Sequence, residues 1–380
     1  MNSGLKTLFM LDPSITYLNH GSYGACPKPI FNDLIKWQKQ LENEPVRHLA
    51  YDIYPLLEQS RKSLSKYIGC DKDDIIFTPN PSTALNTVIK SLDLNKGDEI
   101  LTTNHEYGAL DKTWSFICKK TGAKYIKQKI NLPLISNENF INQFVSGITD
   151  KTKIIFLSHI TSSTALIFPA EEICKIAKKK NIMCIIDGAH VPGHMKLDIS
   201  TIDPDVYVGA CHKWMCSPKG VSFLYVKKSL QNMIDPLVVS WGYEAEEPGH
   251  SQFLDYHQWQ GTRDMSAYLT IPKTIEFLNK NKWNEVGSEC RKINLWARKE
   301  INQLLSQKPL CSEKFLGQMS CIYLNFKNPI QTQIDFYIKY NIQIPFIMWN
   351  NTSLIRISIQ AYNEKEDVYK LLDAIKKEFC

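Results

Sequence analysis

The sequence predicts an α/β protein: a mostly parallel central sheet flanked by helices, followed by a smaller C-terminal α+β domain. Three observations indicate this class. Short apolar runs alternate with helical patterns through the middle of the chain. That rhythm changes after about residue 264. The length of 380 residues suffices for one large and one smaller domain. We expect an N-terminal segment at 1–18, a large domain at 19–264 and a small domain at 265–380.

The large domain carries strand and helix patterns in the order that βαβ units require. Apolar runs predict strands at residues 75–77, 99–102, 153–158, 182–187, 206–208 and 221–226. Helical patterns predict helices at residues 82–91, 109–121 and 169–180, the last with proline in its first turn. Parallel strands joined by helices are covered on both faces, which predicts a layered α/β architecture.

The patterns after residue 264 indicate a different arrangement. One long helical stretch is expected at residues 267–305. Strands are expected at 319–326, 342–345 and 354–359, with helices at 331–340 and 364–379. The alternation of strand and helix is less regular there, so we expect an α+β domain.

Composition excludes several classes of protein. The chain is 43% hydrophobic and 22% charged, with a net charge of +6, and it has no basic stripe with interleaved aromatics, so we expect no nucleic-acid partner. No apolar run reaches membrane-spanning length, and no signal-peptide core opens the chain. Eleven cysteines without a Cys-x-x-Cys pair indicate free thiols in a reducing compartment, which predicts a cytoplasmic protein.

The most informative chemistry lies at two predicted strand ends. Asp187 closes the strand at 182–187, and His212 and Lys213 follow the strand at 206–208. Ligands of open α/β sheets bind outside the carboxyl ends of the strands. A lysine and an acid at such ends fit a pyridoxal 5'-phosphate (PLP) site, because the amine can form a Schiff base with the cofactor aldehyde and the carboxylate can hold the pyridine nitrogen protonated. The freed amine could then move protons at the substrate α-carbon.

Seven short segments, taken in order, resemble the class V aminotransferase family of fold-type I PLP enzymes, most of all its isopenicillin N epimerase-like branch. They lie at residues 17–25, 80–86, 105–109, 187–190, 212–214, 261–263 and 355–358, so the resemblance covers almost the whole chain. It implies the fold-type I architecture, a PLP cofactor and an amino-acid substrate.

The resemblance places the cofactor phosphate at the predicted helix start that carries Ser82 and Thr83, with His212 as a further contact. A helix N-terminus suits an anion, although the same residues would equally serve as a plain N-cap. Related enzymes often carry a hydroxyl residue where this chain has Ala210, so one contact is expected to be missing. Thr262 resembles a residue that reaches the phosphate from the neighbouring subunit, which implies a homodimer with shared sites.

Around the cofactor ring, the resemblance implies that Tyr107 stacks on the pyridine, with His105 or Glu106 as alternatives one or two positions earlier. Thr161 and Ser162 occupy the position that contacts the phenolate oxygen, where many relatives carry asparagine.

His190 lies on the same phenolate side. A metal site formed by Asp187, His190 and His194 fits the spacing, but no further acidic or cysteine ligand joins them in sequence, so we expect no metal.

For the substrate, Arg356 lies within an alternating apolar strand, where a guanidinium needs an anion or solvent. The resemblance assigns it the substrate α-carboxylate, and a structural ion pair is the alternative. His20, Gly21 and Ser22 resemble the substrate-side segment near the N-terminus. Arg47 is a weaker candidate for a second substrate carboxylate.

The reaction is less determined than the cofactor. No cysteine stands between Cys321 and Arg356, which speaks against a persulfide-forming desulfurase. A C–S β-lyase needs only one base, Lys213, whereas an epimerase needs a second proton donor such as Tyr107 or His20. We therefore expect a β-lyase, with an amino-acid epimerase or racemase as the alternative and an aminotransferase behind both. A non-catalytic PLP-fold protein would lack the lysine or the aspartate, and a dehydrogenase would need a Gly-x-Gly-x-x-Gly motif after an early strand.

Overall fold

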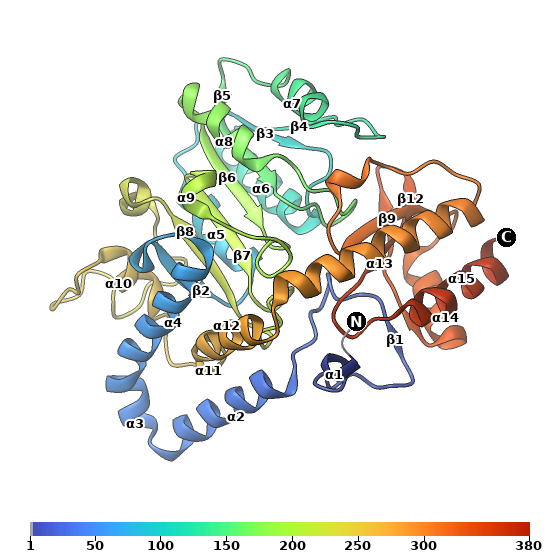
Figure 1. Ribbon diagram of the computed structural model, residues 1–380. Coiled ribbons are helices and arrows are strands. Elements are labelled where there is room, and N and C mark those ends of the chain that lie inside the picture. Colours follow the sequence, from blue (N-terminus) through green and yellow to red (C-terminus); the bar gives the residue numbers. More distant parts are fainter. Residues whose placement is uncertain (1–2) are drawn as a thin grey trace.

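The computed structural model describes residues 3–380, and a seven-stranded sheet forms the centre of its larger part (Figure 1). In their order across the sheet, the strands are β2 (Ile75–Thr78), β8 (Ser222–Val226), β7 (Val206–Ala210), β6 (Met183–Gly188), β5 (Thr152–Ser158), β3 (Glu99–Thr103) and β4 (Lys124–Gln128). Only β8 runs antiparallel to its neighbours. The predicted mostly parallel sheet is therefore confirmed, and the carboxyl ends of its six parallel strands lie at one edge.

Helices cover both faces of this sheet, as predicted. On one face lie α5 (Pro81–Ser91), α6 (Gly108–Thr121) and α10 (Gln252–Gln258). On the other lie α4 (Ile53–Ile68), α8 (Ala170–Lys179) and α12 (Ile271–Lys280). Successive strand residues alternate between the two cores; in β7, for example, Val206 and Val208 join one core and Tyr207 joins the other. α7 (Asn137–Val145) and the short α9 (Ile199–Ile202) lie in the connections before β5 and β7.

The N-terminal helices pack against helices that follow residue 264. After α1 (Ser3–Lys6), the chain forms α2 (Lys28–Asn43), α3 (Pro45–Arg47), a π-helical turn (His48–Asp52) and α4. α11 (Ser266–Leu269) contacts α2 and α4, and α12 contacts the same pair.

The single helical stretch predicted at 267–305 was wrong, because the chain forms α11, α12 and α13 (Trp283–Leu304) there. Pro272 in the first turn of α12 has no N–H for a continuous helix, and Lys282 adopts a left-handed φ of 49° before α13.

The C-terminal part carries its own small sheet. β11 (Phe346–Trp349), β12 (Thr352–Ser358) and β9 (Met319–Tyr323) pair antiparallel. A separate core lies beneath α13, α14 (Pro329–Tyr340) and α15 (Lys365–Phe379). β1 (Thr16–Tyr17) pairs with β10 (Ile342–Gln343), which ties the N-terminal segment to this part of the chain. The domain limits at 18/19 and 264/265 stay predictions.

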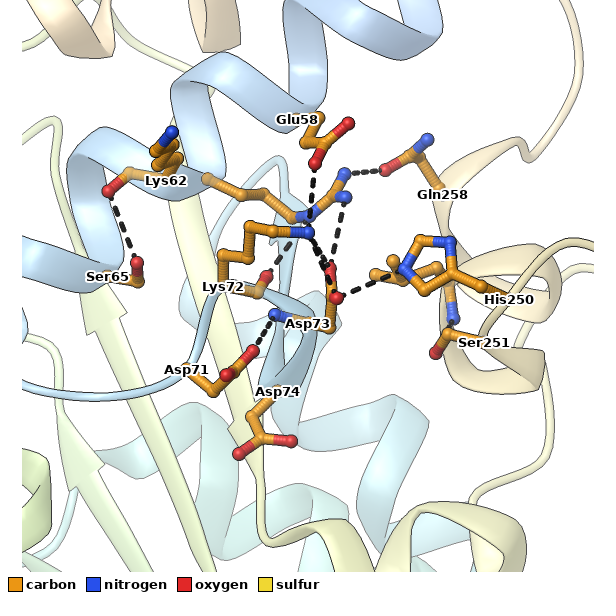
Figure 2. A network of polar contacts seen from close by, with 12 residues as sticks. Glu58, Lys62, Ser65, Asp71, Lys72, Asp73, Asp74, His250, Ser251 and Gln258 are labelled. Carbon is orange, nitrogen blue, oxygen red and sulfur yellow. Dashed lines mark hydrogen bonds and ion pairs between the residues drawn. The ribbon is translucent and has the colours of Figure 1, made fainter.

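A polar network holds the segment between β8 and α10 against α4 (Figure 2). The buried Arg61 donates from Nε to the carbonyl of Lys72 at 3.2 Å, and its Nη2 lies 3.6 Å from Asp73 Oδ1. Asp73 Oδ2 also lies 3.0 Å from His250 Nε2, and Lys72 Nζ lies 2.9 Å from Glu58 Oε1. A buried guanidinium with several partners is costly to separate from them, so this network holds α10 and the residue His250 before it beside α4.

Within residues 3–380, no helix combines the length and the apolar character needed to cross a bilayer.

Candidate active site

A cavity of about 420 Å³ opens at the carboxyl edge of the large sheet. Its walls come from the turns after β2, β3, β5, β6 and β7 and from the segment that precedes α2. Eight of the predicted site residues line it: Ser22, Ser82, Tyr107, Ser162, Asp187, His190, His212 and Lys213. The strand ends thus bring together side chains that are up to 131 positions apart in sequence, from Ser82 to Lys213.

Lys213 stands in the connection between β7 and β8, residues 211–221, which forms the lysine turn. The amides of Cys211 and His212 both donate to the carbonyl of Val221, at 3.0 and 3.1 Å. Gly24 packs on this turn so closely that a Cβ there would lie 2.5 Å from the carbonyl oxygens of His212 and Lys213. The N-terminal segment is therefore part of the support of the lysine, which explains why glycine stands at position 24.

The amine of Lys213 is surrounded by groups that favour its neutral form. Its Nζ lies 3.3 Å from His190 Nε2. The pKa of Lys213 is lowered to about 8, mainly by burial, while Asp187 opposes the change and the charge of Arg356 adds to it. An amine with a pKa near neutrality is a nucleophile and a proton acceptor in physiological conditions.

Asp187 ends β6 and points into the same cavity. Its Oδ1 accepts the amide of Ala189 at 2.9 Å. Burial raises the pKa of this carboxyl, while that hydrogen bond and the Lys213 ammonium oppose the rise. A buried carboxylate with free acceptor capacity suits a cationic N–H partner.

The start of α5 lines the same cavity as Lys213. Asn80 caps the helix, since its Oδ1 accepts the amide of Thr83 at 2.8 Å and the Thr83 hydroxyl at 3.1 Å. Thr83 is consumed by this cap and does not line the cavity, whereas Ser82, His212 and Gly220 do. The Nδ1 atom of His212 is buried and has no hydrogen-bond partner among residues 3–380. A helix N-terminus next to an unpaired imidazole suits a phosphate.

Of the three candidates for ring stacking, only Tyr107 lines the cavity. It lies directly before α6 and is half exposed. His105 is turned away, with Nδ1 2.8 Å from the Thr164 hydroxyl and its ring 4.4 Å from that of Trp349. Glu106 lies beneath the cavity and bonds to Ser158.

Arg356 lies on β12, 3% exposed, behind the cavity wall. Its Nη1 donates to the carbonyl of Ser162 at 2.6 Å and to the Ser162 hydroxyl at 3.2 Å, and its Nη2 donates to the Ser22 hydroxyl at 2.6 Å. Its Nε has no partner, and no carboxylate among residues 3–380 forms an ion pair with it. The structural ion pair that sequence left open is therefore absent from the described chain, and a buried guanidinium without a counter-ion suits an anionic ligand.

Five predicted residues stand apart from the cavity. The Thr161 hydroxyl accepts the amide of Leu166 at 2.8 Å within its own turn. Gly21 packs on the small sheet, where a Cβ would lie 2.8 Å from the sulfur of Met319. Arg47 and Thr262 are exposed on the surface, where Arg47 pairs with Glu44 and Asp52. The fifth residue is His20.

His20 lies behind the lysine turn, not in front of it. Its Nε2 lies 2.9 Å from the carbonyl oxygen of Lys213, and its Nδ1 lies 2.9 Å from the Tyr362 hydroxyl. With both ring nitrogens engaged and the ring fully buried, His20 supports the turn and does not reach the cavity.

Several lining residues were not among the predicted ones, including Tyr23, Ser158, Lys219 and Gly220. The signal for Ser158 was its place at a strand end. Lys219 carries no sequence signal that separates it from surface lysines.

The donor set fits PLP. Lys213 offers a neutral amine for an aldehyde, Asp187 a carboxylate for a pyridine nitrogen, and Ser82 with His212 donors for a phosphate. The unpaired Nδ1 of His212 and the unpaired Arg356 are the structural observations that favour an anionic cofactor and an anionic substrate here. Among residues 3–380, no cluster of histidine, cysteine, aspartate and glutamate side chains is arranged to hold a metal ion.

Comparison with known proteins gives one family and several relatives. The family model described as Aminotransferase class-V matches residues 25–371. The isopenicillin N epimerase of Amycolatopsis lactamdurans is 28% identical, over 97% of this chain and 96% of that protein. The hercynylcysteine sulfoxide lyase of Schizosaccharomyces pombe is 27% identical, over 99% and 97%. A C-DES mutant with glycine covalently linked to its PLP cofactor has a similar fold, with a TM-score of 0.86, 21% identity and coverage of 99% of both chains.

Glu106, which the sequence suggested only as an alternative stacking residue, carries a buried carboxyl group. Its Oε1 accepts the Thr103 hydroxyl at 2.6 Å, and its Oε2 accepts the amide and hydroxyl of Ser158 at 2.9 and 2.5 Å. Burial raises its pKa from 4.5 to about 7; the bonds from Ser158 and Thr103 oppose the rise, and Asp187 adds to it. Since Ser158 pairs in register with Asp187, the Glu106 carboxyl is hydrogen-bonded to the strand end next to Asp187.

The first prediction concerns Glu106→Gln. Between pH 4.5 and about 7 the unfolded chain loses this proton while the folded chain keeps it, so the carboxyl destabilises the fold progressively as pH rises through that window. Relative to the parent, the variant should gain up to roughly 3 kcal/mol of unfolding free energy between pH 4.5 and pH 8. Urea unfolding of both proteins across this range measures the gain.

A suitable control is Glu289→Gln on α13. The exposed Lys292 lowers the pKa of Glu289, so its small effect should have the opposite sign. A difference between Glu106→Gln and the parent that stays constant with pH would contradict the assignment of a raised pKa to Glu106.

Proposed function

The chain belongs to the class-V aminotransferase family, and from this premise we propose that it is a C–S β-lyase acting on an amino acid. The family is PLP-dependent, so the chain is an enzyme and its cofactor is PLP. The observation that carries the proposal is one cavity lined by Asp187 and by a buried Lys213 amine of lowered pKa, with Arg356, which has no counter-ion within the described chain, behind the cavity wall.

Each residue of the cavity then has a role set by its place. Lys213 would hold the cofactor, Asp187 its pyridine nitrogen, and Ser82, His212 and Gly220 its phosphate. Tyr107 would cover one face of the ring. When bound, PLP withdraws electrons from the substrate α-carbon, which makes the α-proton acidic.

Arg356 orients the substrate, and Lys213 deprotonates it. Arg356 fixes the α-carboxylate, and Ser22 and Ser162 hold the guanidinium in place by the hydrogen bonds they accept. Lys213, whose pKa is lowered to about 8 by burial, accepts the α-proton as a neutral base. The proton ends on the lysine amine, and its neighbour His190 stays neutral because burial lowers the imidazole pKa.

The structure favours elimination over epimerisation on one point. Inversion at the α-carbon needs a proton donor on the face opposite Lys213. Of the two residues expected to serve, His20 is engaged behind the lysine turn, and only Tyr107 lines the cavity. Elimination needs a leaving group at the β-carbon and Lys213 alone. The sulfoxide lyase relative supports this choice and the epimerase relative supports the alternative.

We also propose a homodimer with shared sites. Large apolar side chains are exposed near α3, at Val46 and Tyr51, and in the segment after β8, at Val239 and Trp241, the last 88% exposed. Such surfaces mark association sites. Thr262 lies outside its own cavity, so it is available to a partner's phosphate site.

We place the protein in the cytoplasm on the state of its thiols. All eleven cysteines lie within residues 3–380 and none forms a disulfide, although the sulfurs of Cys174 and Cys184 are 3.5 Å apart. Free buried thiols suit a reducing compartment.

The reaction is tested with cysteine, cystine and cysteine S-conjugate sulfoxides in deuterated water. We expect pyruvate, ammonia and a sulfur product in equal amounts, because the leaving sulfur group takes the β-carbon bond electrons and the enamine left behind hydrolyses. Lys213→Ala should form none of them. Deuterium at the α-carbon with inversion and no keto acid would establish epimerisation instead. A keto acid that retains the whole side chain would establish transamination and contradict the lyase.

Arg356→Ala should lower kcat/KM by roughly 30- to 900-fold, equivalent to about 2–4 kcal/mol, because the substrate carboxylate loses its bidentate partner. Steady-state kinetics measures the loss, and the absorbance of bound PLP shows that the variant has folded. Arg47→Ala, which removes an exposed guanidinium, should change kcat/KM by less than about 2-fold. A large loss in Arg47→Ala with none in Arg356→Ala would move the carboxylate site to Arg47.

The shared site is tested by mixing two inactive variants, Lys213→Ala and Thr262→Glu. In a heterodimer the subunit that keeps Lys213 receives an intact Thr262 from its partner, so one site per heterodimer should regain activity. Refolding the two from a denatured mixture and assaying the product measures this. An active monomer in sedimentation, or no recovery in a proven heterodimer, would contradict the proposal.

A further inference from the structure

Three side chains beside the cavity form one line of polar contacts. Trp214 Nε1 lies 3.3 Å from His190 Nδ1, and His190 Nε2 lies 3.3 Å from Lys213 Nζ. We infer that Trp214 is a positioning residue that fixes the tautomer of His190, so that the His190 Nε2–H points at Lys213 and favours the free-base form of its amine. The inference rests on the proposed function in one respect, that Lys213 is the amine that attaches the cofactor.

The direction of each hydrogen bond follows from the donors available. An indole nitrogen only donates, so His190 Nδ1 has to accept from Trp214. A neutral imidazole carries one proton, which must then sit on Nε2. An imidazolium would set two N–H groups against each other, and burial lowers the pKa of His190 well below its usual range. His190 is therefore a neutral donor at Nε2, and the Lys213 amine is the acceptor.

Only a free-base amine can accept that bond, since an ammonium has no lone pair. The line thus favours the same form of Lys213 that burial favours, with a pKa of about 8. The charged and titratable groups around Lys213 and His190 shift the pKa values of these two residues. Arg356 lowers the pKa of both Lys213 and His190, and Asp187 raises that of Lys213. His194 and His20 also lower the pKa of His190.

Trp214 is held firmly enough to impose this choice. Its fully buried ring lies between two imidazoles, 4.1 Å from His194 and 5.1 Å from His20 by ring centroids. Its carbonyl accepts from Trp283 Nε1 at 3.2 Å. At Gly193, with φ of 80°, a Cβ would lie 2.5 Å from that carbonyl group. The indole therefore cannot turn away from His190 without disturbing several contacts.

His190 is fixed from its backbone side as well. His194 Nδ1 lies 3.1 Å from the carbonyl oxygen of His190, and His194 Nε2 accepts the amide of Gln318 at 2.7 Å. Since Nε2 accepts, the proton of His194 is on Nδ1 and donates to His190. The segment before β9 thus helps to place the imidazole that faces Lys213.

The test uses the apoprotein and reads the Lys213 amine itself. PLP is added at a series of pH values, and the rate of its capture is followed by absorbance, with the attachment site identified by reduction and peptide mapping. The parent should show a capture rate that rises with an apparent pKa near 8. Trp214→Phe keeps a ring between the two histidines but loses the donor, so His190 can accept from an ammonium. Its apparent pKa should rise by about 1, and capture at neutral pH should slow by roughly 10-fold.

A matched control is Trp349→Phe, which removes an indole donor that bonds the carbonyl of Asn104 at 2.8 Å; its capture profile should equal that of the parent. A second pair covers the case in which Trp214→Phe does not fold. In His190→Gln the amide oxygen can accept from Trp214 and the amide nitrogen can donate to Lys213, so the profile should be kept, whereas His190→Leu should show the raised apparent pKa.

The outcomes separate this inference from the proposed function. A parent that captures no PLP at Lys213 overturns both. A parent that captures it normally while Trp214→Phe, or His190→Leu if the first variant does not fold, gives the same pH profile overturns the inference alone. A raised apparent pKa in the donor-less variants, with both controls unchanged, supports it.

Discussion

The whole site depends on lowering the pKa of one primary amine at the buried edge of a sheet. An exposed lysine is protonated at neutral pH and can neither attack an aldehyde nor accept a proton. Here desolvation supplies the main effect on Lys213, and Arg356 adds to it. Asp187 works against it, yet its carboxylate is needed for a cofactor nitrogen. The Lys213 amine contacts a ring nitrogen of His190 at 3.3 Å, and no carboxylate among residues 3–380 forms an ion pair with it.

The parallel sheet brings the residues of this arrangement together. The carboxyl ends of the parallel strands lie at one edge of the sheet (Figure 1). Ser158, Asp187 and the connection after β7 therefore line one cavity. The N-terminal segment then closes the site from the other side. It brings Ser22 to Arg356 and Gly24 to the lysine turn. Since β1 also pairs with β10, this segment joins the large sheet, the small sheet and the substrate carboxylate site in one stretch of chain.

The sequence predicted those elements and site residues that hydrophobic periodicity and strand ends indicate. Asp187 and Lys213 were found because each follows a clear apolar run, and Arg356 because a guanidinium within an alternating strand needs a partner. β4 was missed because its exposed lysines, Lys124 and Lys127, make an edge strand look like a polar connection. The three helices after residue 264 look like one because a proline in a first turn and a left-handed residue leave the helical pattern intact.

The placement of individual side chains was harder to predict, for a physical reason. His20 and Ser22 are two positions apart in one motif, yet one faces the back of the lysine turn and the other faces Arg356. That difference is set by packing on distant parts of the chain and leaves no local signal. The most direct test of the account is reduction of the PLP-loaded protein with borohydride, followed by peptide mass mapping. The account predicts the reduced cofactor on Lys213 alone, and label on Lys219, the other lysine of the cavity, or on no lysine would contradict it.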